Sequence, residues 1–200
     1  MNKCKNMSFE IISKTTKSFK IKIKNTDISK VINIRKLIYT NIKTYAPFLV
    51  IFYANDNNLT LKCTDIAHRI GLIILQNSLL SKIYKQGIYY RCKLEHTAKE
   101  DFEDVWSDNI ELLDQYNKPT GIFPFIEGFF ITQLLKNQTL HLDIIINKDT
   151  SNKHLKYRPG NVTSFKEIDN NTFILDIDSF GILDIDNFYN KIIKYTKKLI

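Results

Sequence analysis

The stretch Ser18-Phe19-Lys20-Ile21-Lys22-Ile23-Lys24 alternates strictly between polar and apolar side chains. Successive side chains of a β-strand point to opposite faces, so Phe19, Ile21 and Ile23 share one face and the other is largely lysine. This pattern predicts a strand that has one face in a core and the other in solvent.

A second alternating stretch lies near the other end of the chain. Within Thr172–Asp178, an apolar face is formed by Phe173, Leu175 and Ile177. Phe180-Gly181 then indicates a turn into a last helix that begins at about Asp186. The sequence therefore predicts one half-buried strand in each terminal region.

Amphipathic helices are expected beside both strands. Asp27 is a suitable N-cap for a helix that runs to about Lys43. At about 100° per residue, Val31, Ile38 and Ile42 fall in one arc of that helix, with Ile32 and Tyr39 just beyond. The apolar stripe of the last helix comprises Phe188, Tyr189, Ile192, Ile193, Leu199 and Ile200.

One cation, Arg35, falls inside the apolar arc of the first helix. Burying an unpaired guanidinium is costly, so Arg35 is expected to reach a carboxylate or a partner surface. Alternatively, its aliphatic stem packs while the charged head reaches water. The helix pattern alone leaves both interpretations open.

Mostly strands are predicted between the two helices. These are a buried strand from Pro47 to Ala54, a short strand at Leu59–Cys63, and strands at Gly87–Leu94 and Thr139–Ile146. The segment Trp106–Gly128 contains several prolines and glycines and is expected to be irregular. The predicted class is α+β, with helices near both ends.

The composition is that of a soluble globular protein, with 44% hydrophobic and 25% charged residues. The longest apolar run, Ala46–Ala54, falls far short of the about 20 residues of a membrane-spanning helix, and no signal peptide is visible. Cys4, Cys63 and Cys92 are odd in number and widely spaced, which favours free thiols. An intracellular protein without membrane contact is expected.

The formal net charge of +8 has two explanations. A basic protein can be a free-standing nucleic-acid-binding protein, because clustered cations bind phosphates. The lysines here are scattered, however, and the abundance of Lys, Asn and Ile is typical of AT-biased coding. The second explanation is favoured, and nucleic-acid binding is kept as an alternative function.

His68-Arg69 stands directly before an apolar run that contains Gly71. The pair could act as a base and an anion clamp. No nucleophile motif or phosphate-binding loop accompanies it, and the chain has no Cys-x-x-Cys. A structural histidine beside a salt-bridged arginine is favoured, and no catalytic residue, metal or cofactor is expected.

Two Asp-Ile-Asp repeats, Asp176/Asp178 and Asp184/Asp186, suggest a metal-dependent nucleotidyltransferase or nuclease. The alternation instead places Asp176 and Asp178 on the polar face of a strand, and Asp184 or Asp186 suits a helix N-cap. The catalytic interpretation is the less favoured alternative.

The run Ala67-His68-Arg69-Ile70-Gly71-Leu72 resembles the Ala-His-Arg-Leu-Gly-Leu signature of an RNA polymerase assembly subunit. The family comprises the third-largest eukaryotic subunit, its archaeal counterpart and the N-terminal part of bacterial alpha. Further segments resemble it in the family's order: Ile34–Ile38, Tyr45–Pro47, Asn58–Leu59, Val105–Ile110, Leu134–Leu140, His154–Pro159 and Phe173–Gly181.

The chain also departs from the family pattern. Ile32, Lys36 and Ile74 replace the family's Asn, second Arg and Pro, and the cysteine-rich metal loop of many relatives is absent. The His-x-Lys-aromatic-x-Pro element in His154–Pro159 is similar to the eukaryotic, archaeal or viral branch. The departures indicate a divergent, compact version of this subunit, and the abundance of Lys, Asn and Ile favours a large DNA virus or a similarly reduced genome as its source.

The resemblance implies a bacterial-alpha-N-terminal-like dimerisation domain, a sheet plus two helices, formed by residues 1–44 and 160–200. A mostly-β domain is inserted at 45–159. The chain would heterodimerise with a smaller alpha-like subunit and carry the second-largest and largest subunits, which hold the catalytic chemistry. It would meet nucleic acid only through the complex, in the nucleus or in a cytoplasmic viral factory or virion.

The same resemblance implies roles for individual residues. Ile38, Ile42, Phe188 and Ile192 would be buried at the dimer interface. Arg35, Lys36, His68 and Arg69 would make polar contacts to a large subunit. Structural roles within the motifs are expected for Ala67, Gly71, His154, Tyr157 and Gly181.

Overall fold

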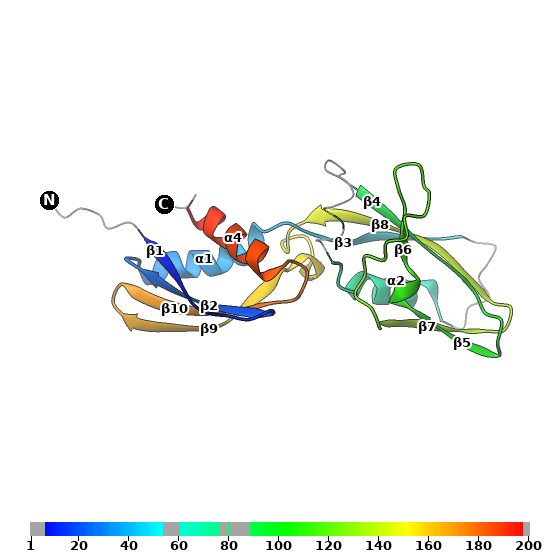
Figure 1. The fold of residues 1–200 in the computed structure, drawn as a ribbon, viewed down its shortest axis with the longest axis horizontal. Helices are drawn as coiled ribbons and strands as arrows, with labels where there is room; N and C mark the ends of the chain where they lie inside the picture. The colour runs from blue at the N-terminus through cyan, green and yellow to red at the C-terminus, as the bar shows by residue number, and fades with distance from the viewer. Residues whose placement is uncertain (1–6, 54–60, 77–79, 81–88, 198–200) are drawn as a thin grey trace. The chain divides into compact units, whose positions relative to one another are not determined.

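The computed structural model describes residues 7–53, 61–76, 80 and 89–197 (Figure 1). It is an α+β protein, as the sequence pattern predicted, and its sheets are antiparallel. The chain forms two compact units, residues 1–44 with 150–200 and residues 45–149. The first unit is thus built from both ends of the chain.

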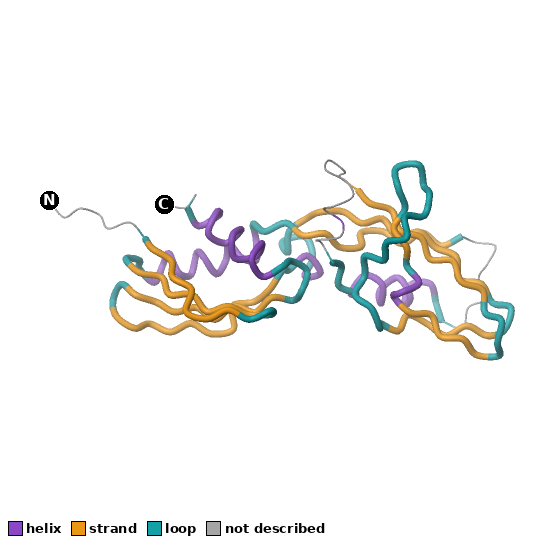
Figure 2. The backbone as a smooth tube through the Cα atoms, in the orientation of Figure 1, coloured by secondary structure: helices purple, strands orange, loops and turns teal. Residues whose placement is uncertain are grey.

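The first unit contains a four-stranded antiparallel sheet in the order β1-β2-β10-β9 (Figure 2). The strands are β1 (Ser8–Lys14), β2 (Ser18–Lys24), β9 (Gly160–Asp169) and β10 (Thr172–Ser179). The two alternating stretches pair in the centre of the sheet, with Ile21 opposite Leu175. Both predicted strands and their buried faces are confirmed.

Two helices, α1 (Ile28–Thr40) and α4 (Ile185–Thr196), pack on the apolar face of this sheet and touch each other (Figure 1). The Asp27 carboxylate accepts the Lys30 N–H at 2.9 Å, which confirms the predicted N-cap. The helix ends at Thr40, slightly earlier than expected. Leu199 and Ile200 of the predicted stripe lie outside the described residues.

The segment from Thr150 to Pro159, assigned above to the inserted domain, belongs to the first unit. It contains the short 3-10 helix η3 (Leu155–Tyr157). The Thr44 hydroxyl donates to the Tyr157 carbonyl at 2.6 Å, and the Arg158 guanidinium lies 4.1 Å from the centre of the Tyr39 ring. These contacts attach the segment to Tyr39, near the end of α1, and to Thr44, the first residue of the strand that follows α1.

The second unit has a four-stranded sheet, a two-stranded sheet and one helix around a separate core. The larger sheet has the order β3-β8-β4-β6 and the smaller one pairs β5 with β7. The elements are β3 (Thr44–Phe52), α2 (Cys63–Leu72), β4 (Tyr89–Thr97), β5 (Phe102–Trp106), η2 (Ser107–Asn109), β6 (Glu111–Leu112), β7 (Phe130–Leu135) and β8 (Thr139–Asp149).

Two strand predictions in this unit are corrected. The expected strand Leu59–Cys63 is not seen in its described part, because Cys63 already begins α2. The apolar run after Pro47 is a strand, but β3 lies at a sheet edge, so Phe48, Leu49 and Ile51 are exposed rather than buried. The expectation for Trp106–Gly128 is confirmed, since η2 and β6 are its only regular elements in the described chain.

Other sequence features are located as follows. Cys63 is half-buried and Cys92 is buried, both as free thiols, while Cys4 lies outside the described residues. Burial raises the pKa of the Cys92 thiol well above its usual range. Within the described ranges, no helix is long and apolar enough to span a membrane.

Candidate subunit interfaces

The four side chains expected at a dimer interface lie in the core of the first unit itself. Ile38, Ile42, Phe188 and Ile192 are all 0% exposed in the single chain. The ring of Phe188 packs edge-on against Phe19 of β2, with centroids 5.7 Å apart. The sheet of this chain therefore covers the apolar faces of both helices, and these residues present no surface to another subunit.

A different line of residues on α1 is exposed. Ile28 and Ile32 are 47% and 46% exposed, and Arg35 is also exposed. Their spacing of four and three residues places all three on one helix face, which we call the α1 stripe. Arg35 lies here rather than in the core, because Ile34 and Leu37 are buried as well and shift the centre of the packed face away from it.

A polar cluster flanks the α1 stripe. The Tyr39 hydroxyl donates to the Asn161 side chain at 2.7 Å and accepts the Val162 N–H at 3.3 Å, while Arg158 donates to Asn161 at 2.6 Å. Burial raises the pKa of Tyr39, but hydrogen bonding, first from the Arg35 guanidinium, outweighs it and leaves the pKa below its usual value. The cluster fixes the side of α1 next to the stripe.

The His154–Pro159 segment supports this cluster. His154 is exposed and its Nδ1 accepts the Lys156 N–H at 3.2 Å, which begins η3. Tyr157 is buried in the first unit. Gly181, with φ at +84°, adopts the left-handed backbone that the turn into α4 requires. The structural roles expected for these three residues stay predictions.

The His68-Arg69 motif lies on α2 in the second unit. Ile66 and Ile70 of this helix are buried, whereas His68 and Arg69 are exposed and Ala67 is half-buried. Arg69 Nη1 donates to the Ile131 carbonyl of β7 at 2.8 Å, and the guanidinium lies 5.7 Å from the centre of the Phe130 ring. The motif therefore attaches α2 to β7.

Two expectations about this motif are corrected. Arg69 is not salt-bridged: in the described part of the chain no carboxylate lies within ion-pair distance of it. Gly71 is not needed for packing, because a Cβ built on it meets no atom within 4 Å. Lys36 was expected to contact a large subunit together with His68 and Arg69. It is exposed on α1 in the first unit, whereas His68 and Arg69 lie in the second unit.

The outward face of the β5–β7 pair is unusually apolar. The register places Phe102 opposite Leu135, Asp104 opposite Gln133 and Trp106 opposite Phe130. We call these six residues the ribbon face. Its four apolar side chains are between 38% and 66% exposed. Sequence reasoning missed this surface, because β5 and β7 are far apart in the chain and their pairing register includes a bulge.

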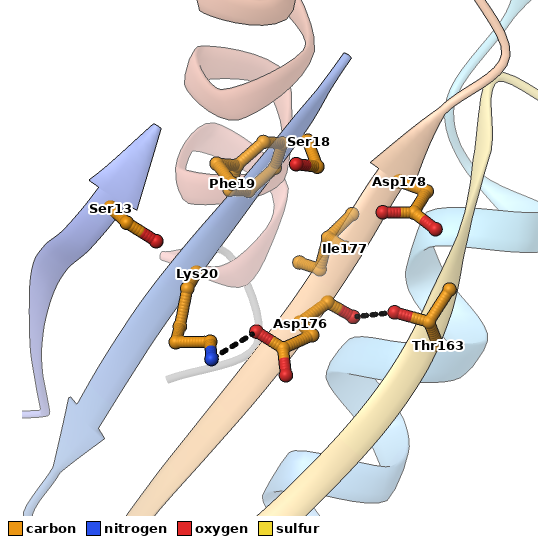
Figure 3. Close-up of a pocket in the computed structure, with 8 residues that line it drawn as sticks. All are labelled: Ser13, Ser18, Phe19, Lys20, Thr163, Asp176, Ile177 and Asp178. Atoms are coloured by element: carbon orange, nitrogen blue, oxygen red, sulfur yellow. Dashed lines mark hydrogen bonds and ion pairs between the residues drawn. The ribbon is translucent and has the colours of Figure 1, made fainter. Parts of the chain in front are cut away.

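The two Asp-Ile-Asp repeats of the alternative catalytic interpretation lie on different elements, the first on β10 and the second at the start of α4. Asp176 and Asp178 line a pocket of about 300 Å³ on the outer face of the first sheet (Figure 3). Lys20 pairs with the Asp176 carboxylate at 3.2 Å, and the Ser164 hydroxyl donates to it at 2.6 Å. Asp184 is the N-cap residue of α4, and Asp186 pairs with Lys14.

These positions bear on both alternative functions. No group of three or more His, Cys, Asp or Glu in the described residues is arranged to hold a metal ion. The lysine-rich face of β2 is interleaved with acids, since Lys24 also pairs with Glu10 at 2.8 Å. Hydrogen bonding and charge from Lys24 hold the pKa of Glu10 below its usual value. The contacts favour a structural role for this face.

A buried ionic cluster in the second unit was also missed by sequence reasoning. Asp143 on β8 is only 2% exposed. Arg91 of β4 donates to it through Nε at 3.0 Å and through Nη2, and Tyr53 donates its hydroxyl. Hydrogen bonding to Asp143 raises the pKa of Arg91. The signal was an acid inside the otherwise apolar run of β8.

No protein-family model and no curated protein matches this sequence.

Proposed function

We propose that this chain is a non-catalytic assembly subunit of a multisubunit DNA-directed RNA polymerase. It forms a heterodimer with a smaller, related subunit and anchors the second-largest and largest subunits. The α1 stripe is the single observation that carries the proposal, since it is an exposed apolar line on a unit built from both ends of the chain. The order of the sequence motifs supports the choice of this complex.

The smaller subunit packs on the α1 stripe. Ile28 and Ile32 expose apolar area that a partner helix would remove from water, at about 25 cal/mol per Å². Arg35 stands at the end of the stripe and supplies hydrogen-bond donors for a partner carboxylate. This assignment replaces Ile38, Ile42, Phe188 and Ile192, which already serve the core.

The remaining polar motif residues belong to contacts with the large subunits. Lys36, His68 and Arg69 are exposed and charged or titratable, so they suit polar contacts at the edge of an interface. Nucleotide and metal chemistry resides on the large subunits, and this chain meets nucleic acid only through the complex. Its place of action is the nucleus or a cytoplasmic viral factory.

Affinity purification of the tagged full-length chain from its native cells tests the proposal. We expect co-purification of identified polymerase subunits, quantified by mass spectrometry. Ile32→Glu and Arg35→Ala should reduce recovery of the smaller subunit at least about tenfold, a change of about 1.4 kcal/mol. Circular dichroism should show that both variants keep the fold, because these side chains are outside the core.

Ile168→Glu is a matched control, since Ile168 is an equally exposed isoleucine of the same unit but lies on β9. Recovery should be unchanged with this variant. The proposal is overturned if the unmodified chain recovers no polymerase subunit, or if Ile168→Glu lowers recovery as much as Ile32→Glu does.

A further inference from the structure

The ribbon face differs from an ordinary solvent face of a sheet. A half-exposed strand usually alternates apolar-in and polar-out, as β2 does. On the ribbon, Val105 and Leu134 point into the core while Phe102, Trp106 and Phe130 remain in solvent. Trp106 and Phe130 touch each other, and adjoining exposed aromatic side chains are typical of an interaction surface.

Two of the three residue pairs of the ribbon face are held in place by contacts within the chain. The Trp106 and Phe130 rings meet edge to face, with centroids 5.6 Å apart, and Gln133 donates to Asp104 at 2.9 Å. Next to them in the chain, the buried Ser107 hydroxyl donates to the Ile126 carbonyl at 2.7 Å and accepts the Phe129 N–H at 3.1 Å. Binding therefore orders few side chains, and this lowers its entropic cost.

The charge at one end of the face indicates the chemistry of its partner. Arg69 stands at the Trp106–Phe130 end and uses one N–H for the Ile131 carbonyl. A guanidinium has five N–H donors, so others remain for a ligand. Asp104, the acid within the face, is engaged by Gln133. The end of the ribbon face thus offers a cation to a carboxylate beside an apolar surface.

We infer that the ribbon face and Arg69 bind a segment of a large polymerase subunit that places apolar side chains over Phe102 and Trp106 and a carboxylate on Arg69. Trp and Arg are enriched among the residues that dominate binding energy at protein interfaces, and Phe is enriched in interface cores. This inference rests on the proposed function and adds a second contact. The α1 stripe and the ribbon face then serve different partners from different units.

Purification of tagged full-length variants from the native cells separates the two contacts. We expect Phe102→Asp and Arg69→Glu each to reduce recovery of the large subunits at least about tenfold while the smaller subunit is retained. Ile32→Glu should instead reduce recovery of the smaller subunit while the large subunits are retained. Tyr116→Asp is the matched control, because Tyr116 is a still more exposed aromatic residue of the same unit outside the ribbon face. This variant should recover the large subunits as well as the unmodified chain does.

The proposed carboxylate predicts a dependence on salt. Raising the salt concentration should release the large subunits from the unmodified chain more steeply than from Arg69→Gln, because screening removes only the charged part of the contact. A photo-crosslinking amino acid in place of Trp106, at the Arg69 end of the face, should attach to a peptide of a large subunit that contains Asp or Glu close to the crosslink.

Three results overturn the inference. Unchanged recovery of the large subunits with both ribbon variants, or a crosslink to the smaller subunit or to a second copy of this chain, removes the ribbon contact and leaves the proposed function standing. Absence of every polymerase subunit from the unmodified chain removes the proposed function and this inference together.

Discussion

The outward faces of two strand pairs, β2–β10 in the first unit and β5–β7 in the second, differ in chemistry. On β2 the outward lysines meet acids, as Lys20 meets Asp176. On β5 the corresponding positions carry Phe102 and Trp106. An ion-paired face is stable in water alone, whereas an aromatic face gains from a partner. The difference separates a face whose charges are paired within the chain from a face whose aromatic side chains are left in solvent.

The helices show the same contrast. The periodic apolar residues of α1 and α4 pack in the core of the first unit. The periodicity predicted correctly that these residues are buried, but it did not show that the sheet of the same chain covers them. On α2 the motif residues His68 and Arg69 are exposed, although they looked structural. Amphipathic pattern and motif likeness therefore answer different questions, one about the core and one about surfaces.

The largest effect is expected from Phe188→Ala in the first unit. Removing this fully buried ring should lower the free energy of unfolding by about 4 kcal/mol, because the core loses both apolar burial and packing. Chemical denaturation of the isolated chain measures the change. Ile32→Ala, on the α1 stripe, should cost less than about 1 kcal/mol. If the Phe188 variant were as stable as the unmodified chain, Phe188 would not contribute to the core, and the earlier expectation that it lies at a dimer interface would be favoured again.

Two glycines, one in each unit, sharpen the comparison. A Cβ on Gly160 would lie 2.2 Å from the Asp178 carbonyl oxygen and 2.7 Å from the Phe188 ring, so Gly160→Ala should destabilise by about 3 kcal/mol. On Gly71 of α2 a Cβ meets nothing, so Gly71→Ala should gain about 0.5–1 kcal/mol from helix propensity. Thermal unfolding of both variants tests the pair. A destabilised Gly71 variant would restore the structural interpretation of the motif.

Asp143→Asn tests the buried ionic cluster of the second unit. The substitution keeps the shape of the side chain but leaves Arg91 without its charged acceptor, so we expect a loss of about 2 kcal/mol. The exposed pair in the first unit provides the matched control, since Asp176→Asn should cost less than about 1 kcal/mol. Denaturation of both variants at neutral pH measures the difference. Equal losses would contradict the contrast between buried and solvated pairs.

The smallest effect is a pH dependence at the start of β5. Hydrogen bonding from the Lys99 N–H, with a contribution from His96, holds the pKa of Glu103 below its ordinary value of 4.5. A depressed carboxyl pKa stabilises the fold above the unfolded-state pKa, and this stability is lost as the pH falls through the folded-state pKa. Unfolding measured from about pH 6 to about pH 3 should have a shallower acid slope in Glu103→Gln. An unchanged slope would show that the carboxylate does not contribute.

The sequence predicted the first unit better than the second. Strict alternation in Ser18–Lys24 and Thr172–Asp178 identified both central strands, and Asp27 identified the start of α1. These signals are local, so a single sequence contains them. Arg35 was misplaced because the arc was drawn without Ile34 and Leu37, which are buried too.

The candidate surfaces depend on contacts between distant segments. Trp106 and Phe130 become neighbours only through the bulged register of β5 and β7, and Asp143 becomes an ionic site only when Tyr53 and Arg91 fold over it. The exposure of Phe48 and Ile51 follows from the edge position of β3. No local pattern specifies these pairings.

The construction of the first unit from both chain ends has a consequence during synthesis on the ribosome. The second unit, residues 45–149, is contiguous and can fold as soon as it has emerged. β2 must wait for β10, and α1 for α4, before their core closes. The α1 stripe is therefore presented on a closed core only after β10 and α4 have emerged, and a chain cut short before residue 172 lacks that core.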